Sequence, residues 1–195
     1  MENYLTDINL KINSDTVLFF DMDGTLIDTD FANFLSYQEA IKSVMQCETE
    51  IQYFPNERFN RTTLNRVVPN LTEERLVEII KQKEINYKKH LSQTKLNKAV
   101  SDILIQYSKT NQTVLVTNCR EDRAVLTLEY HKLIDKFNHL FFKEIDEKAN
   151  RVNKYKNALN NLSLSAKIVV AFENEKVEIE DAKLAGIPID NIISL

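Results

Sequence analysis

The sequence predicts a doubly wound α/β fold built on a parallel sheet. Three short apolar runs, each rich in β-formers and bounded by polar residues, predict buried strands at residues 16–20, 113–117 and 168–172. Stretches with helical periodicity lie at 98–109, 153–162 and 177–185. Strands that are apolar along their whole length must be covered on both faces. Their alternation with amphipathic helices is therefore typical of a parallel sheet between two helical layers.

The remaining elements of this pattern are marked less strongly. Weaker apolar runs at 140–142 and 191–195 predict two further strands. One face of each predicted helix is apolar, and we expect these faces to pack on the sheet. Their residues are Val100, Ile103, Leu104 and Tyr107 in the first helix, Tyr155, Leu159 and Leu162 in the second, and Val177, Ile179, Ala182 and Ala185 in the third.

Residues 30–92 interrupt this alternation and predict a small all-helical insert, because no strand pattern is evident there. Asp30 can cap a first helix. Asn70 can cap another, with Glu73 three residues later as its capping-box partner. The lysine-rich run 81–95 is interpreted as the solvated face of this second helix, with phosphate binding as the alternative.

The composition excludes several classes of protein. The chain has 195 residues, 43% hydrophobic and 28% charged, with a net charge of −4, which argues against a nucleic-acid-binding surface. No apolar run approaches the roughly 20 residues of a membrane span, and the polar N-terminus lacks the apolar segment of a secretory signal. Two cysteines, Cys47 and Cys119, rule out a disulfide framework and favour a reducing compartment. We therefore expect a cytoplasmic monomer or homodimer with no membrane or nucleic-acid partner.

Two carboxylates, Asp21 and Asp23, follow the first predicted strand. At positions i and i+2 of an extended segment they point to the same side, and the carboxyl end of a parallel strand faces the ligand crevice of an open α/β sheet. Like charges this close need a cation between them or a proton on one of them. The pair therefore suits a nucleophile beside a general acid–base, with a hard divalent cation bound by oxygen. The alternative is a calcium loop, but residues 25–27 supply none of the further acids that it would need.

Glycine is rare, since the chain has only Gly24 and Gly186, against roughly 14 in an average chain of this length. We interpret both as positions where the backbone requires glycine. Gly24 lets the chain turn away sharply after the two carboxylates. Gly186 follows Ala185 at the end of the last predicted helix, where it would serve as a C-cap.

Polar residues also follow the second predicted strand. A hydroxyl at a strand end, beside the backbone N–H groups of a following helix, can bind a phosphate oxygen. We assign that role to Thr117, with Asn118 assisting. Cys119 is a weaker candidate nucleophile, because no histidine lies near it in the sequence. Arg120 and Arg123 follow on the next predicted helix and either reach a substrate or solvate that face.

These segments resemble a known family. The sequence VLFFDMDGTLIDT is similar to the first motif of the haloacid dehalogenase-like (HAD) phosphohydrolases, in the DxDGT form of their phosphatases and phosphomutases. The resemblance implies that Asp21 is a nucleophile that forms an aspartyl-phosphate. It also implies that Asp23 is the acid–base, that the Asp23 carbonyl and the Asp21 carboxylate bind Mg²⁺, and that Gly24 and Thr25 contact the substrate.

The second and third family motifs follow in the expected order. The segment Thr117-Asn118-Cys119-Arg120 looks like the second motif. The third motif is a lysine near a helix start, which neutralises the phosphate and the nucleophile. The resemblance implies Lys154 in this role, with Lys148 as the alternative.

The segment from Phe172 to Pro188 is similar to the fourth motif, whose acids complete the Mg²⁺ shell. The resemblance implies Glu173, Asn174 and Glu178 as metal ligands. Asn174 departs from the family, which usually has Asp there. Its amide oxygen can bind Mg²⁺, but one negative charge is lost, and Glu175 or Glu178 can compensate for it.

The resemblance places the chain in the phosphoglycolate phosphatase and β-phosphoglucomutase-like branch. It implies a Rossmann-like core at 1–29 and 93–195, with a helical cap of the C1 arrangement at 30–92. The expected activity is Mg²⁺-dependent hydrolysis of a small phosphomonoester metabolite through an aspartyl-phosphate. The acidic Asp23 excludes a haloacid dehalogenase, which has a non-acidic residue there. A phosphomutase of the β-phosphoglucomutase type and a non-catalytic binding module on the same core are the alternatives.

Overall fold

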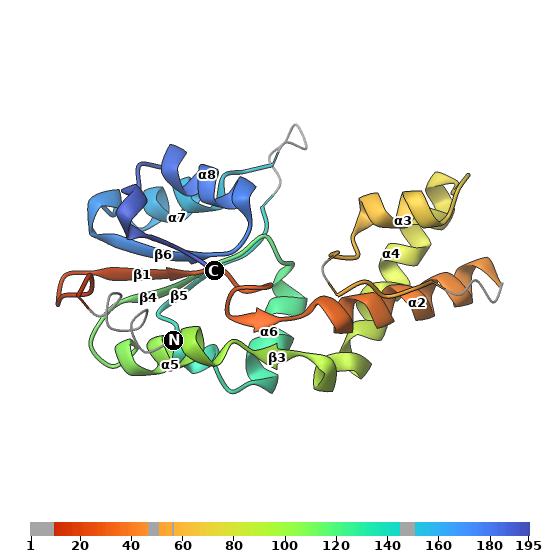
Figure 1. Cartoon of the computed structure of the whole chain (residues 1–195), viewed down its shortest axis with the longest axis horizontal. Helices are drawn as coiled ribbons and strands as arrows, with labels where there is room; N and C mark the ends of the chain where they lie inside the picture. The colour runs from red at the N-terminus through yellow and green to blue at the C-terminus, as the bar shows by residue number, and fades with distance from the viewer. Residues whose placement is uncertain (1–9, 47–50, 56, 145–150) are drawn as a thin grey trace. The chain divides into compact units, whose positions relative to one another are not determined.

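The structure, a computed structural model, describes residues 10–46, 51–55, 57–144 and 151–195. The chain divides into two compact units (Figure 1). Unit 1 is Met1–Ile27 with Leu96–Leu195, and unit 2 is Asp28–Lys95. The second unit therefore begins two residues before the predicted insert, 30–92, and ends three residues after it.

Unit 1 is built on a five-stranded parallel sheet with the strand order β5-β4-β1-β6-β7. Each of the five predicted apolar runs contributes one strand. The strands are β1 (Val17–Phe20), β4 (Thr113–Val116), β5 (His139–Phe141), β6 (Val169–Glu173) and β7 (Ile192–Ser194).

Helices cover both faces of this sheet, as Figure 1 shows. On one face, α5 (Lys98–Tyr107) and α6 (Glu121–Tyr130) pack on alternate strand residues that include Leu18 and Phe20. On the other face, α7 (Lys154–Asn161) and α8 (Lys176–Leu184) pack on the intervening residues, including Val17 and Phe19. The predicted doubly wound architecture is therefore confirmed.

The direction of winding reverses at β1. The connections from β1 to β4 and on to β5 pass over one face, through α5 and α6, whereas those to β6 and β7 pass over the other, through α7 and α8. Open α/β sheets bind ligands at such a switch point, beyond the carboxyl ends of the strands. In this fold that place lies beyond Phe20, between the ends of β4 and β6.

Two details of α8 follow from its packing. Ala182 is buried against the sheet, but Val177 is 61% exposed, so the predicted apolar face was wrong at its first residue. The helix ends with Gly186 at φ +94°, with its N–H bonded to the Lys183 carbonyl and the Ile187 N–H bonded to the Ala182 carbonyl. This pair of bonds is a Schellman motif, in which a left-handed residue terminates the helix, as we predicted for this glycine.

Unit 2 is helical, with its own core. Its helices are α2 (Asp30–Met45), α3 (Arg61–Val67), α4 (Glu73–Tyr87) and the 3₁₀ helix η1 (Lys88–Gln93). Its core includes Phe34 and Ile41 of α2, Leu64 of α3 and Ile79 of α4. Where the chain enters and leaves the unit, the two-residue strands β2 (Ile27–Asp28) and β3 (Lys95–Leu96) pair with each other.

The helix caps in unit 2 differ from the predicted ones. The N-cap of α2 is Thr29, and Asp30 is the first helical residue. The N-cap of α4 is Thr72, whose hydroxyl accepts a hydrogen bond from the Arg75 N–H, while Asn70 lies in a left-handed turn at φ +60°. A threonine hydroxyl supplies the same acceptor as an asparagine side chain, so the helix starts two residues later than the pattern suggested.

One lysine of the predicted solvated face is in fact buried. Lys83 is 2% exposed, and its ammonium lies 5.5 Å from the ring centroid of Tyr37 and 5.4 Å from that of Tyr87. An ion pair of 3.3 Å joins it to Glu84. Cation–π contacts and this ion pair compensate for the lost hydration of the charge, so the lysine belongs to the structure of unit 2.

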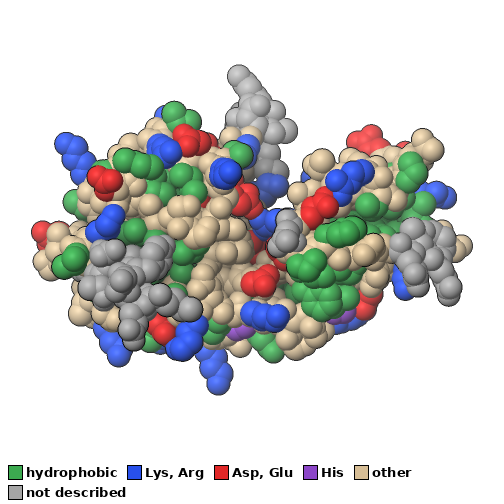
Figure 2. Space-filling model, in the orientation of Figure 1, with side chains coloured by type: hydrophobic (Ala, Val, Ile, Leu, Met, Phe, Trp, Pro, Cys, Tyr) green, Lys and Arg blue, Asp and Glu red, His purple; other side chains and the backbone are tan. Residues whose placement is uncertain are grey.

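Charged side chains cover much of the rest of the surface. On the face of each unit drawn in Figure 2, basic and acidic side chains are interspersed. No helix in the described part of the chain has both the length and the apolar composition needed to cross a membrane.

Candidate active site

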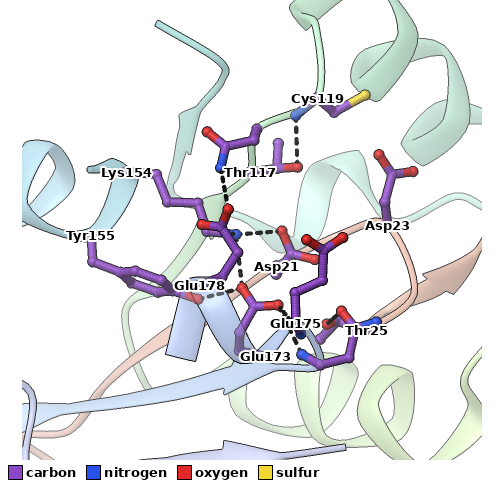
Figure 3. A network of polar contacts seen from close by, with 12 residues as sticks. Asp21, Asp23, Thr25, Thr117, Cys119, Lys154, Tyr155, Glu173, Glu175 and Glu178 are labelled. Carbon is purple, nitrogen blue, oxygen red and sulfur yellow. Dashed lines mark hydrogen bonds and ion pairs between the residues drawn. The ribbon is translucent and has the colours of Figure 1, made fainter. Parts of the chain in front are cut away.

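The carboxyl edge of the unit 1 sheet holds a buried ionic cluster around Asp21 and Lys154 (Figure 3). Asp21 follows β1 directly, and Lys154 is the first residue of α7. The Lys154 Nζ lies 2.7 Å from Asp21 Oδ1 and 2.8 Å from Glu173 Oε2, at the end of β6. A third carboxylate, Glu178 of α8, lies 3.7 Å away. The ammonium thus neutralises carboxylates from three separate segments of the chain.

Both carboxylate oxygens of Glu173 accept two hydrogen bonds each. Its Oε1 accepts hydrogen bonds from the backbone N–H groups of Asn174 (2.8 Å) and Glu175 (2.9 Å). Its Oε2 accepts from Lys154 and from the Tyr155 hydroxyl at 2.7 Å. With four donors and no exposure to solvent, this carboxylate is a rigid anchor for Lys154.

Burial dominates the electrostatics of the cluster. Burial raises the pKa of Asp21 to about 7, with Lys154 opposing the rise and Glu173 and Asp23 adding to it. Burial alone would lower the pKa of Lys154, but the attraction of Asp21, Glu173 and Glu178 outweighs it and holds the pKa above its usual value. Desolvation also raises the pKa of Tyr155 well above its usual value, so its hydroxyl remains a donor.

Glu178 and Asn118 extend the cluster toward the end of β4. Asn118 Nδ2 donates to Glu178 Oε1 at 2.9 Å, and Arg151 forms an ion pair of 3.1 Å with the same oxygen. Glu178 Oε2 is buried without a hydrogen-bond partner among the described residues. Burial raises the pKa of Glu178, whereas the positive charges of Lys154 and Arg151 oppose that rise.

Thr117 stands at the end of β4, almost fully buried. Its hydroxyl oxygen accepts a hydrogen bond of 3.1 Å from the Cys119 N–H, which shapes the turn before α6. The same hydroxyl retains a proton that it can donate to a phosphate oxygen. The loop from Thr117 to Arg120 therefore presents the side chains and backbone groups that an anion would meet at the start of α6.

Asp23 is part of a second polar group, on the side of the loop that faces α6. Its Oδ2 lies 3.3 Å from Arg123 Nη2, and Arg123 Nε donates to Cys119 Sγ at 3.0 Å. Figure 3 shows the Asp23 carboxylate directed away from that of Asp21. The two acids of the motif therefore have different partners, a lysine for Asp21 and an arginine for Asp23.

Asn174 contacts the turn that follows Asp23. Its Oδ1 accepts a hydrogen bond of 2.9 Å from the Thr25 hydroxyl. Gly24 has φ +86°, and a Cβ built on it would lie 2.5 Å from Asn174 Nδ2. The amide therefore packs directly on the glycine, and this loop needs glycine both for its left-handed backbone and for its close approach to Asn174.

The family of the chain follows from its sequence as a whole. The family model of the haloacid dehalogenase-like hydrolases matches residues 18–191. The chain belongs to this family. The resemblance predicted from the motifs is thereby confirmed, and the HAD-like hydrolase family is a family of enzymes.

Solved structures support the same fold. A predicted phosphoglycolate phosphatase from Haemophilus somnus superposes with a TM-score of 0.73 at 18% identity, over 94% of this chain and 85% of the other. A HAD-like family protein from Streptococcus pneumoniae gives 0.67 at 17% identity, over 94% and 95%. A candidate β-phosphoglucomutase from Thermotoga maritima gives 0.64 at 24% identity, over 91% and 83%. No curated protein matches the chain.

The residues of this HAD-like site fit a Mg²⁺ ion by the chemistry of their donors. Asp21, Glu173 and Glu178 place three carboxylates around a single lysine, so negative charge is in excess. Among the described side chains no ready-made group of three metal-ligating residues exists, so an ion would depend on backbone oxygen and water as well. Mg²⁺ commonly binds in this way, through one or two carboxylates and several waters.

The predicted site residues divide into groups. The structure brings Asp21, Lys154, Glu173, Glu178 and Asn118 into one connected network, and it places Thr25 and Gly24 against Asn174. The Asp23 carboxylate forms an ion pair with Arg123, and the Thr117 hydroxyl accepts a hydrogen bond from the Cys119 N–H. The alternative lysine, Lys148, lies outside the described residues.

Sequence reasoning missed three side chains of the site. Arg151, which forms an ion pair with Glu178, was not singled out. Tyr155 appeared only as an apolar-face residue, although its position next to the motif lysine was a usable signal. For Arg123 the sequence indicated two alternatives, contact with a substrate or solvation of the helix face. Arg123 lies two residues after the first residue of α6. Nothing in that position indicated that its partner is Asp23, which follows another strand.

The two glycines of the chain offer a matched test of this loop. Both lie at positive φ, so alanine at either position should cost about 1–2 kcal/mol. At Gly186 the new Cβ would meet only Ala166 Cβ at 3.5 Å, an ordinary contact, whereas at Gly24 it would collide with Asn174. In urea unfolding we expect Gly24→Ala to lose at least about 1 kcal/mol more than Gly186→Ala. Equal losses would show that Asn174 moves aside at no cost.

Proposed function

We propose that this HAD-like chain is a Mg²⁺-dependent phosphatase that hydrolyses a small phosphorylated metabolite through an aspartyl-phosphate on Asp21. The observation that supports this most strongly is the Lys154 ammonium, 2.7 Å from Asp21 Oδ1 at the switch point of the sheet. A carboxylate oriented by a lysine, next to a loop suited to phosphate oxygens, is the arrangement that nucleophilic attack on phosphorus requires.

The first half-reaction uses Asp21 as the nucleophile. Lys154 holds Oδ1, so the other carboxylate oxygen, Oδ2, attacks phosphorus. The P–O bond to the alcohol breaks as the Asp–O–P bond forms. Asp23 gives its proton to the departing alcohol oxygen, and Thr117 and Asn118 donate hydrogen bonds to the phosphoryl oxygens.

The second half-reaction regenerates the enzyme. Asp23, now ionised, takes a proton from a water molecule, which attacks the phosphorus of the aspartyl-phosphate. Phosphate leaves, and the Asp21 carboxylate is free again, paired with Lys154. The sum is one phosphomonoester and one water converted to one alcohol and one phosphate.

A Mg²⁺ ion bound by the Asp21 carboxylate and the Asp23 carbonyl would neutralise charge on the phosphoryl group. Asn174 and Glu178 are the further side chains that we propose for its surroundings, with Glu173 acting through Lys154 because all its lone pairs are directed at donors. Glu175, which follows Asn174, is a further acid at the end of β6, and its backbone N–H donates to Glu173 Oε1.

We propose that unit 2, residues 28–95, is a helical cap of the C1 type. It is inserted after the first motif and before the second, as in HAD-like enzymes with such caps, and it forms its own core. Caps of this kind select substrates and exclude water. This agrees with a small metabolite as substrate. The cytoplasmic setting that we propose rests on the composition, which includes only two cysteines.

The test is phosphate release from p-nitrophenyl phosphate with Mg²⁺ and after its removal with EDTA. We expect activity that EDTA abolishes and added Mg²⁺ restores. A panel of phosphorylated metabolites then identifies the substrate and separates a phosphatase, which releases phosphate, from a phosphomutase, which returns an isomeric sugar phosphate. No hydrolysis or transfer with any member would favour a non-catalytic binding module.

Asn174→Asp tests the role of the missing charge. The aspartate can still accept from Thr25, 2.9 Å from the present amide oxygen, and adds one negative charge at the turn that follows Asp23. We expect its affinity for Mg²⁺ in isothermal titration to be about tenfold tighter than that of the wild type, because ligand charge strengthens such sites. Asn161→Asp, on the exposed side of α7, is the control. Unchanged affinity would indicate that Asn174 serves the loop and that another acid already provides the charge.

A further inference from the structure

Arg123 is a buried arginine next to the proposed acid–base. Its Nη2 lies 3.3 Å from Asp23 Oδ2, and the two side chains are only 15% and 7% exposed. Water screens such a pair less than it screens an ion pair on the surface. The contact therefore has enough energy to influence which way the Asp23 carboxylate points.

The arginine is itself fixed in place. Arg123 Nε donates to Cys119 Sγ at 3.0 Å, and the Cys119 N–H is bonded to the Thr117 hydroxyl oxygen at 3.1 Å. Arg123 also belongs to α6, which packs on the sheet through Ala124 and Leu128. Cys119 thus ties the guanidinium to the phosphate loop, and the packing of α6 on the sheet fixes the backbone of Arg123.

The Asp23 carboxylate is engaged with Arg123 in this structure. An acid that serves the leaving group must reach the oxygen opposite the nucleophile, in line with the bond that Asp21 forms. Figure 3 shows the Asp23 carboxylate directed away from Asp21. We infer that Asp23 leaves Arg123 to reach the leaving group. Asp23 is the side chain that turns, since Cys119 holds Arg123 in place.

We propose that Arg123 is a positioning residue that holds the Asp23 carboxylate in a resting orientation, so that this ion pair must break in each turnover. The proposal rests on the proposed function, in which Asp23 is the acid–base. It assigns a role to a side chain outside the four sequence motifs, and it gives Cys119 the role of fixing that side chain.

The kinetic test compares two substrates that differ in their need for a proton. The p-nitrophenolate ion leaves readily without one, whereas the phenolate of phenyl phosphate depends on the acid. We expect Arg123→Gln to raise kcat for phenyl phosphate by about threefold, the size of effect that a partly shielded ion pair allows. The kcat for p-nitrophenyl phosphate should stay within twofold of wild type, roughly the limit of a neutral change. Arg123→Lys, which keeps the charge, should restore the wild-type ratio.

The Asp23→Asn background decides whether Arg123 acts through Asp23. In that background Arg123→Gln should have no effect on either substrate. Lys183→Gln is the control, because Lys183 forms an exposed ion pair with Glu180 at 2.7 Å near the C-terminus of α8. Equal effects on both substrates, or an effect that persists in the Asp23→Asn background, would overturn the proposal. A fall in kcat for phenyl phosphate would also overturn it, since Arg123 would then hold the productive orientation.

A crystal structure of Arg123→Gln tests the same proposal without turnover. We expect its Asp23 carboxylate to leave the position it has in the wild type and to turn toward Asp21. An unchanged orientation would overturn the proposal. If the wild-type enzyme hydrolyses neither these two substrates nor any member of the metabolite panel, the proposed function fails, but the crystallographic comparison still decides whether Arg123 holds Asp23.

Discussion

Asp21→Asn should abolish turnover while leaving the fold intact. The amide is nearly the same size as the carboxylate, but it cannot attack phosphorus. Lys154 keeps its ion pair with Glu173 at 2.8 Å, so the buried cluster should survive the change. We expect kcat to fall at least about 10⁴-fold, as when the nucleophile of another enzyme with a covalent intermediate is removed. Initial rates of phosphate release and a circular dichroism spectrum measure both parts of this prediction.

A matched control shows whether the loss of a negative charge alone, without loss of the nucleophile, affects the rate. Asp190 is exposed, far along the chain from the motif, and Asp190→Asn removes one carboxylate in the same way. It should retain the wild-type rate. If Asp21→Asn retained that rate too, no covalent mechanism through Asp21 could hold.

Lys154→Met should have the largest effect on stability. The substitution keeps the length and bulk of the side chain but leaves Asp21 and Glu173 without their shared cation, while Glu178 keeps its ion pair with Arg151. Removing one partner from a buried ionic group typically costs about 3–5 kcal/mol, because the remaining charge is uncompensated, and we expect a loss of that size in urea unfolding. Activity should be lost as well, since the same ammonium orients Asp21.

Lys156→Met provides the comparison on the same helix. Lys156 is exposed and two residues from Lys154, so its replacement should change stability by no more than about 0.5 kcal/mol. A loss below about 1 kcal/mol for Lys154→Met would mean that Asp21 and Glu173 are protonated or solvated, and that the lysine does not organise the cluster.

The parts of the fold that the sequence predicted well are those that local patterns encode. The runs around Phe19, Val114 and Ala171 are apolar because a parallel strand under two helical layers has no exposed face. The position of Asp21 followed from the same logic, because the first polar residue after a buried strand lies at the edge of the sheet. Gly186 was equally readable, since a lone glycine after a helical pattern marks a left-handed end.

The features that the sequence did not predict depend on contacts between distant segments. Nothing near Arg123 indicates that it meets Asp23, 100 residues earlier in the chain. The burial of Lys83 depends on Tyr37 and Tyr87, whose rings only the packed helices bring together. The cap at Thr72 lies two residues after the predicted one, because several polar side chains can satisfy the same backbone N–H groups. Thr29, one residue before the other predicted cap, makes no side-chain capping hydrogen bond.

The most direct test of the central claim is to find the phosphoryl group on the enzyme. Asp23→Asn should slow the hydrolysis of the intermediate, by roughly 10²–10⁴-fold, more than its formation from a substrate with a good leaving group. We therefore propose to mix this variant with p-nitrophenyl phosphate and Mg²⁺, quench with acid, and map the modified peptide by mass spectrometry. We expect one phosphoryl group on Asp21, and none in the Asp21→Asn, Asp23→Asn double variant. A phosphoryl group on Thr117 or Cys119, or release of p-nitrophenolate with no modification of Asp21, would contradict it.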